Sequence, residues 1–219
     1  MKYVIMCGGS YDQFETPRQL SVINGERIAD RTVRLLREAG AEDICISATD
    51  ERFDSCGVPR LVHQNNFRVV NGKAEGYWLD AFYPFFDANQ KVTFIFGDVY
   101  FTEEAIRRIV SFRGIGNVLF GTSDAKNELH ENWGEPFAYV VNDYATFMQG
   151  VRSVKILQDL GLLKRCAIVW ELYRFLNHLD VNVQAVLPET YVCIDDGTLD
   201  VDTPAHIDLI SRRFSCSSQ

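Results

Sequence analysis

Two aspartates stand two positions apart near the end of the chain, in the run Asp-Val-Asp-Thr-Pro from Asp200 to Pro204. On an extended strand, residues two apart project to one face, so the carboxylates of Asp200 and Asp202 would lie side by side. Two such charges repel each other unless a cation lies near them, and a divalent metal is an economical cation for this purpose. Alternatively, Asp202 caps the helix that begins at Thr203-Pro204 and Asp200 is solvated, which is the simpler interpretation of this motif alone.

A third aspartate, Asp98, comes directly after Gly97 and the apolar run 92–96. Such a run of β-branched and aromatic residues is typical of a central strand that is covered on both faces. In parallel α/β sheets, ligands bind at the carboxyl ends of the strands, so Asp98 would project into a cleft as a ligand for Mg²⁺. It could equally begin the turn before the next helix, whose start is indicated by Thr102 and the two glutamates that follow it.

A glycine-containing loop follows the first predicted strand and ends at Pro17-Arg18. Gly8 and Gly9 would let backbone N–H groups approach a phosphate or the edge of a base, and Arg18 could neutralise phosphate charge. A Gly-Gly pair after a strand is also a common turn, and neither a Walker A loop nor a full dinucleotide fingerprint is present. The loop therefore points to a nucleotide only in combination with the other motifs.

The elements that must position these residues alternate along the first half of the chain as strand, helix, strand, helix, strand, helix and strand. This order predicts an α/β protein, a Rossmann-like three-layer α/β/α arrangement with a mostly parallel central sheet. The later part predicts a small inserted or appended α/β lobe. The predicted strands are 2–6, 43–48, 60–63, 92–96, 117–120, 136–141, 183–187, 191–194 and 199–201. The predicted helices are 28–39, 77–86, 102–110, 144–163, 166–176 and one that starts at 203, and 71–76 is predicted as a loop.

Composition restricts the class of protein. The chain has 219 residues and a formal net charge of -8, with 47% apolar and 24% charged residues, which is ordinary for a single soluble domain. The acidic balance counts against a nucleic-acid partner. No run approaches the roughly 18 apolar residues of a membrane span, and the start of the chain lacks a signal-peptide core. The six cysteines and four histidines show no disulfide or zinc pattern, so a cytoplasmic protein is expected.

Taken in order, the motifs resemble those of the nucleotidyltransferase superfamily of sugar-nucleotide pyrophosphorylases and small cytidylyltransferases, which has the nucleotide-diphospho-sugar transferase fold. The family pattern is a strand, then Gly-Gly-x-Gly-x-Arg and Pro-Lys, then a strand ending in Asp, and finally Asp-x-Asp-Thr-Pro before a helix. This sequence follows that order over nearly its whole length. It departs from the pattern at three positions: Tyr11 replaces a loop glycine, Gln13 replaces the arginine and Arg18 replaces the lysine.

The resemblance implies a Mg²⁺-dependent nucleotidyltransferase. Such an enzyme moves a nucleoside monophosphate, here with CTP as the favoured donor, to a phosphorylated small-molecule acceptor and releases pyrophosphate. About 1–125 would be the nucleotide-binding half of one domain spanning 1–219, and about 126–219 the acceptor half. The implied catalytic residues are Arg18, Asp98 and Asp202, and the implied metal ligands are Asp98, Asp200 and Asp202. The implied nucleotide contacts are Cys7, Gly8, Gly9, Ser10, Arg18, Asn71, Gly72 and Lys73. Glu135 is the implied acceptor contact, although an exposed turn acid would explain it as well.

Two other functions stay open. A glycosyltransferase of the related fold would carry its Asp-x-Asp in the middle of the chain, whereas the only Asp-x-Asp here lies near the end. A catalytically impaired nucleotide-binding relative would explain the shortage of positive charge that Tyr11 and Gln13 leave in the first loop. The helix pair between 144 and 176 is compatible with a homodimer face.

Overall fold

The computed structural model describes residues 1–8, 14–62, 67–70, 73–85, 90–122 and 134–215. These residues form an α/β fold around a seven-stranded sheet with the order β12-β10-β11-β8-β1-β4-β5. The strands of this sheet are β1 (Lys2–Met6), β4 (Asp43–Ser47), β5 (Arg60–Leu61), β8 (Val92–Phe96), β10 (Val118–Gly121), β11 (Pro136–Val141) and β12 (Tyr191–Cys193).

The sheet is mostly parallel, as predicted. Strand β11 runs antiparallel to both of its neighbours, β8 and β10, and every other pairing in the sheet is parallel. Strand β8 is buried along its whole length, and so is β1 after its first residue, which explains their near-continuous apolar sequences. The carboxyl ends of the parallel strands share one edge, so the polar motifs that follow β1 and β8 come out at the same side of the molecule.

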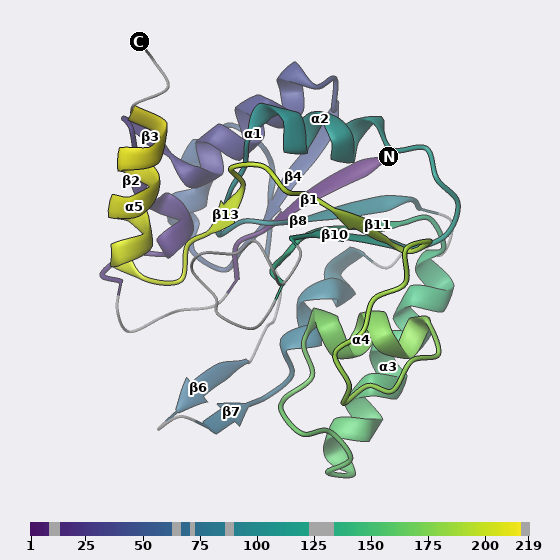
Figure 1. The fold of residues 1–219 in the computed structure, drawn as a ribbon. Helices are drawn as coiled ribbons and strands as arrows, with labels where there is room; N and C mark the ends of the chain where they lie inside the picture. The colour runs from purple at the N-terminus through teal and green to yellow at the C-terminus, as the bar shows by residue number, and fades with distance from the viewer. Residues whose placement is uncertain (9–13, 63–66, 71–72, 86–89, 123–133, 216–219) are drawn as a thin grey trace.

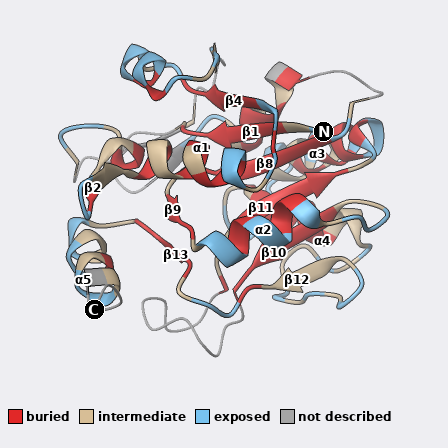
Figure 2. Ribbon diagram, turned by 90° about the horizontal axis from the view of Figure 1, so that it is seen from above, coloured by how far each residue is buried: buried red, intermediate tan, exposed pale blue. Residues whose placement is uncertain are grey.

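Helices cover both faces of the sheet (Figure 1). Helices α1 and α2 contact each other on one face, while α3, α4 and the 3₁₀ helix η3 lie on the other. Figure 2 shows the central strands buried and the outward sides of the helices exposed. None of the helices within the described ranges is long and apolar enough to cross a lipid bilayer. The helices are α1 (Ile28–Glu38), η2 (Glu51–Cys56), η3 (Trp78–Phe85), α2 (Glu103–Ser111), α3 (Tyr144–Asp159), α4 (Val169–Leu176) and α5 (Pro204–Ser215).

A second, smaller apolar cluster lies at the edge where β1 and β8 end (Figure 1). It joins the hairpin β2–β3, the two-stranded ladder β9–β13 and helix α5, and Tyr100 packs on Phe214 with ring centroids 5.1 Å apart. Burial of apolar surface thereby fixes the ladder against the hairpin and α5. The short strands are β2 (Val22–Ile23), β3 (Glu26–Arg27), β9 (Val99–Tyr100) and β13 (Leu199–Asp200). The buried members of the cluster are Ile23, Ile28, Tyr100, Leu199, Val201 and Ile210.

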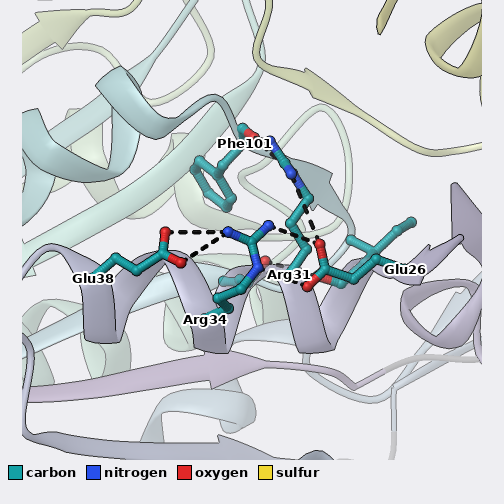
Figure 3. A network of polar contacts seen from close by, with 7 residues as sticks. Glu26, Arg31, Arg34, Glu38 and Phe101 are labelled. Carbon is teal, nitrogen blue, oxygen red and sulfur yellow. Dashed lines mark hydrogen bonds and ion pairs between the residues drawn. The ribbon is translucent and has the colours of Figure 1, made fainter. Parts of the chain in front are cut away.

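Charged side chains of α1 hold the same edge from outside (Figure 3). Arg34 donates to Glu26 of β3 through Nε at 2.9 Å and Nη2 at 2.8 Å, and these hydrogen bonds lower the pKa of Glu26. Arg31 donates from Nε and from Nη2 to the carbonyl oxygen of Phe101, at 3.2 Å each. Its guanidinium also lies 4.6 Å from the centre of the Tyr100 ring. Helix α1 therefore anchors both the hairpin and the chain that follows β9.

Several predicted elements differ in the structure. Residues 183–187 form no strand, and Val183 and Val186 are exposed there. The segment predicted as a helix at 77–86 is the 3₁₀ helix η3, which contains Pro84, a residue without the N–H that an α-helix needs. The predicted loop 71–76 contains a strand, because β6 (Arg68–Val70) and β7 (Lys73–Glu75) pair as a hairpin. Helix α3 ends at Asp159, four residues early, where Gly161 takes a φ of 67°.

Candidate active site

The guanidinium of Arg18 lies between the carboxylates of Asp98 and Asp202. Its Nη2 donates to Oδ2 of Asp98 and its Nη1 donates to Oδ1 of Asp202, and both contacts are ion pairs. The Arg18 side chain is 6% exposed, whereas those of Asp98 and Asp202 are 22% and 38% exposed. The structure therefore brings together the three residues that the sequence predicts as catalytic, and leaves one side of the cluster open to solvent.

The β9–β13 ladder places the two aspartates beside each other. Asp98 directly precedes β9, Asp202 lies two positions after the end of β13, and the two strands are antiparallel. The N–H of Val201 donates to the carbonyl oxygen of Asp98 at 2.8 Å, which continues the pairing up to the site. Arg18 reaches the same point from the 3₁₀ helix η1 (Arg18–Leu20). Three segments that are distant in sequence thus converge at the carboxyl edge of the sheet.

The chain leaves β8 through Gly97, which lies against the end of β1. The N–H of Gly97 donates to the carbonyl oxygen of Met6 at 3.0 Å. A Cβ added at Gly97 would lie 2.5 Å from Sγ of Cys7 and 2.6 Å from the oxygen of Met6, closer than non-bonded atoms approach. A side chain at this position has no space, so the contact with β1 fixes the point from which Asp98 projects.

We expect Gly97→Ala to lower the free energy of unfolding by about 1–3 kcal/mol, because overpacking a filled site forces the backbone to move. Urea denaturation measures the change. Adding Cys7→Ala removes the contact with sulfur but not the contact with the Met6 backbone, so the double variant should recover only part of the loss relative to Cys7→Ala alone. A Gly97→Ala variant as stable as the parent chain would contradict the close approach.

Burial and charge set the protonation of the groups at this edge. Burial raises the pKa of Asp98 above its ordinary value, the charge of Arg18 opposes that rise, and the charge of Asp202 adds to it. A neighbouring cation therefore favours the ionised form of this carboxyl group. Burial, followed by the charge of Asp98, raises the pKa of the Cys7 thiol well above its usual range. Cys7 is therefore protonated at neutral pH and is not a nucleophile.

Asp200 is buried within β13, opposite Val99 of β9, so it is not the solvated acid of the simpler interpretation. Across the part of the chain that the structure describes, no group of three or more His, Cys, Asp or Glu side chains is placed to hold a metal ion. The ligand candidates that share one partner are Asp98 and Asp202. Two carboxylates fit Mg²⁺, which commonly binds one or two of them together with substrate phosphates and water.

The predicted nucleotide contacts are only partly within the described residues. The N–H of Cys7 donates to the carbonyl oxygen of Ser47 at 2.9 Å, so this N–H is already hydrogen bonded within the protein. Gly8 is the first residue beyond this pairing. Lys73 begins β7, opposite Val70 of β6. Six residues of the predicted nucleotide-binding motifs lie outside the described ranges, namely Gly9, Ser10, Tyr11, Gln13, Asn71 and Gly72.

Glu135 lies at the same edge of the sheet as Asp98. It directly precedes β11, and Ala138 of β11 is opposite Ile95 of β8. Because β11 is antiparallel to β8, its first residues lie where β8 ends. The carbonyl oxygen of Glu135 accepts a hydrogen bond from the N–H of Thr122 at 2.9 Å, which fixes the backbone there. This position is compatible with the predicted contact to an acceptor.

His206 contacts the backbone of the site, and the sequence motifs do not assign it a role there. Its Nδ1 accepts a hydrogen bond from the N–H of Asp202 at 3.2 Å, so it orients the backbone at the start of α5. The sequence contains a signal for this contact, since His206 follows Asp202 by four residues, about one turn of the predicted helix.

One solved structure resembles the fold over nearly its whole length. It comes from Bacillus anthracis, is assigned as a glucose-1-phosphate thymidylyltransferase and contains a sucrose. It matches with a TM-score of 0.62 and 16% sequence identity, over 97% of this chain and 94% of that chain. No protein-family model and no curated protein matches the sequence. The likeness shows that the chain shares the fold of that structure, which is the α/β fold that its motifs predict.

Proposed function

We propose that the chain is a Mg²⁺-dependent nucleotidyltransferase that moves a nucleoside monophosphate from a nucleoside triphosphate to a phosphorylated small-molecule acceptor. The supporting observation is the convergence of Arg18, Asp98 and Asp202 at the carboxyl edge of the sheet. In parallel α/β folds this edge is where ligands bind. The proposal includes the division of the chain into a nucleotide-binding half (about 1–125) and an acceptor half (about 126–219).

The proposed reaction requires no covalent bond to the protein, whose side chains only bind and orient the reacting groups. An oxygen of the acceptor phosphate attacks the α-phosphorus, and pyrophosphate leaves. An acceptor phosphate that is already ionised needs no general base, which agrees with a protonated Cys7 thiol and a His206 ring whose Nδ1 is hydrogen bonded. Arg18 would neutralise charge on the triphosphate, while Asp98 and Asp202 would hold Mg²⁺. The metal would supply neutralisation and orientation of the phosphates.

Screening nucleotides by thermal shift, with and without Mg²⁺, tests the proposal most directly. A ligand that binds only the folded chain raises the midpoint of thermal unfolding. At a free ligand concentration of about 100 times Kd, it raises the free energy of unfolding by about 2.7 kcal/mol. We expect CTP with Mg²⁺ to give the largest shift, and TTP belongs in the screen because of the structural neighbour. Pyrophosphate release is then measured with sugar 1-phosphates and polyol phosphates. No shift with any nucleoside triphosphate would overturn the proposal.

A nucleotide-binding relative without catalysis is the second candidate function. The observation in its favour is that Arg18 pairs with both aspartates that the resemblance assigns to the metal. Metal-dependent binding of a triphosphate, without pyrophosphate release across the acceptor panel, would select this candidate. Hydrolysis of a UDP-sugar without turnover of a triphosphate would select a glycosyltransferase instead.

A further inference from the structure

We propose that Arg18 and a divalent cation compete for Asp98 and Asp202, so that Arg18 keeps free cations off this pair until a triphosphate draws the guanidinium away. The competition itself depends only on the three side chains. Its release by a triphosphate rests on the proposed function. Arg18 would then act as a guard on the metal ligands as well as a contact for phosphate.

The contacts of Arg18 already engage both carboxylates. One Nη of the guanidinium bonds Asp98 and the other bonds Asp202, so the positive group spans the gap between the two acids. A Mg²⁺ ion held by this pair would draw on the same two negative charges that the guanidinium neutralises. Two cations so close would also repel each other. A divalent cation that binds both carboxylates therefore has to displace Arg18 from at least one of them.

The departure from the family pattern explains why this residue can bridge the pair. An arginine carries two separate Nη groups in a planar fork, whereas the lysine that the resemblance expects here is a single compact charge. The fork allows Arg18 to bind one acid with each arm.

A triphosphate offers Arg18 an alternative partner. Arginine binds phosphate oxygens through the same paired N–H groups that it offers to carboxylates. When a phosphate takes the guanidinium, the two aspartates lose the positive charge that lies between them, and two neighbouring carboxylates repel each other unless another cation is near. The metal and the nucleotide would therefore bind together. By linkage, each would raise the affinity of the protein for the other.

The test uses Mn²⁺ as the probe, without nucleotide, and follows its binding by electron paramagnetic resonance and calorimetry. Arg18→Met removes the charge at similar length, and we expect it to bind Mn²⁺ at least about tenfold more tightly than the parent chain. Asp98→Asn in the same variant should abolish the gain. The matched control is Arg52→Met, which removes an arginine from a surface ion pair with Asp50 and should leave Mn²⁺ binding unchanged. Equal affinity in the parent chain and Arg18→Met would overturn the inference.

Two further measurements cover an Arg18→Met variant that folds poorly. Mg²⁺ alone should raise its midpoint of thermal unfolding, or restore its folding, while leaving the parent chain unchanged. Arg18→Lys keeps the charge and should bind Mn²⁺ more weakly than Arg18→Met, so equal affinities in these two variants would refute a competition of charges.

The results also separate this inference from the proposed function. A gain of Mn²⁺ binding in Arg18→Met with a silent nucleotide screen would uphold the competition and overturn the nucleotidyltransferase. Turnover of a triphosphate with equal Mn²⁺ affinity in parent and variant would do the reverse. In the parent chain, Mg²⁺ with the triphosphate should shift the midpoint although Mg²⁺ alone does not. A shift with Mg²⁺ alone would overturn the guarding role of Arg18.

Discussion

Asp98→Asn should lower the rate of Mg²⁺-dependent pyrophosphate release by about a thousandfold, a loss typical of removing one charge-stabilising group from an active site. Asparagine keeps the shape of the side chain but loses the negative charge that both Arg18 and a metal ion require. Asp202→Asn should cause a loss of the same order, because the two carboxylates share one partner. The corresponding alanine variants should lose the activity as well. A coupled assay for pyrophosphate at saturating triphosphate and Mg²⁺ measures each variant.

The control for these variants is Asp54→Asn, since Asp54 is also an acid paired with an arginine, Arg60, but lies on the surface. It should keep the full rate. Circular dichroism and the midpoint of thermal unfolding show whether each variant is folded before its rate is interpreted. If both Asp98→Asn and Asp202→Asn turn over normally while folded, the assignment of the metal to this pair is wrong.

The strands that carry the site were predictable because burial on both faces leaves a strong signature. Strands β1, β8 and β11 have the bounds that their apolar runs predict. The start of α2 was equally clear, since Thr102 accepts a hydrogen bond from the N–H of Ala105 at 3.0 Å, as a capping hydroxyl should. The cap of α2 is a contact between neighbouring residues, and the apolar runs of the strands follow from burial alone. Neither depends on a particular distant partner, so both can be predicted from the sequence.

Elements that depend on a partner were less predictable. The run 183–187 is apolar enough for a strand, yet a strand forms only where another strand pairs with it, and these residues are in a loop instead. The reverse holds for β9, which has two residues and was not predicted, and which pairs with β13 inside the predicted strand 199–201. Their pairing puts Asp98 beside Asp202, and periodicity cannot reveal it. Only the ordered resemblance predicted that these two residues would meet.

The bonding of Arg18 was the feature of the site that the sequence concealed. Its position after Pro17 predicted a contact with a triphosphate, and its chemistry is equally suited to carboxylates. Which anion it meets depends on where η1 and the β9–β13 ladder lie in space. The sequence did contain one signal for this contact. An arginine replaces the expected lysine, and its guanidinium can bind two acids at once.

The largest loss of stability should follow Glu171→Ala in α4, which we expect to lower the free energy of unfolding by about 3–5 kcal/mol. Glu171 is 2% exposed, and its Oε2 accepts the N–H of Ile168 at 3.0 Å at the start of the helix. Its Oε1 accepts from Nε of Arg165 at 2.8 Å and lies 3.6 Å from Nη1 of Arg174, which is 3% exposed. Alanine would remove the carboxylate that faces this buried charge. Urea denaturation measures the loss.

Two comparison variants separate the causes of that loss. Arg165→Ala removes the more exposed partner of the same carboxylate, and such pairs contribute at most about 1 kcal/mol. Glu171→Gln keeps an oxygen for the N–H of Ile168 but removes the charge, so it isolates the contribution of the charge that faces Arg165 and Arg174. If Glu171→Ala costs no more than Arg165→Ala, the buried pair does not stabilise the fold. Helix α4 lies on the face of the sheet opposite α1 and α2. The fraction of Glu171→Ala molecules that is folded at low temperature should therefore bind Mg²⁺ and nucleotide together with unchanged affinity.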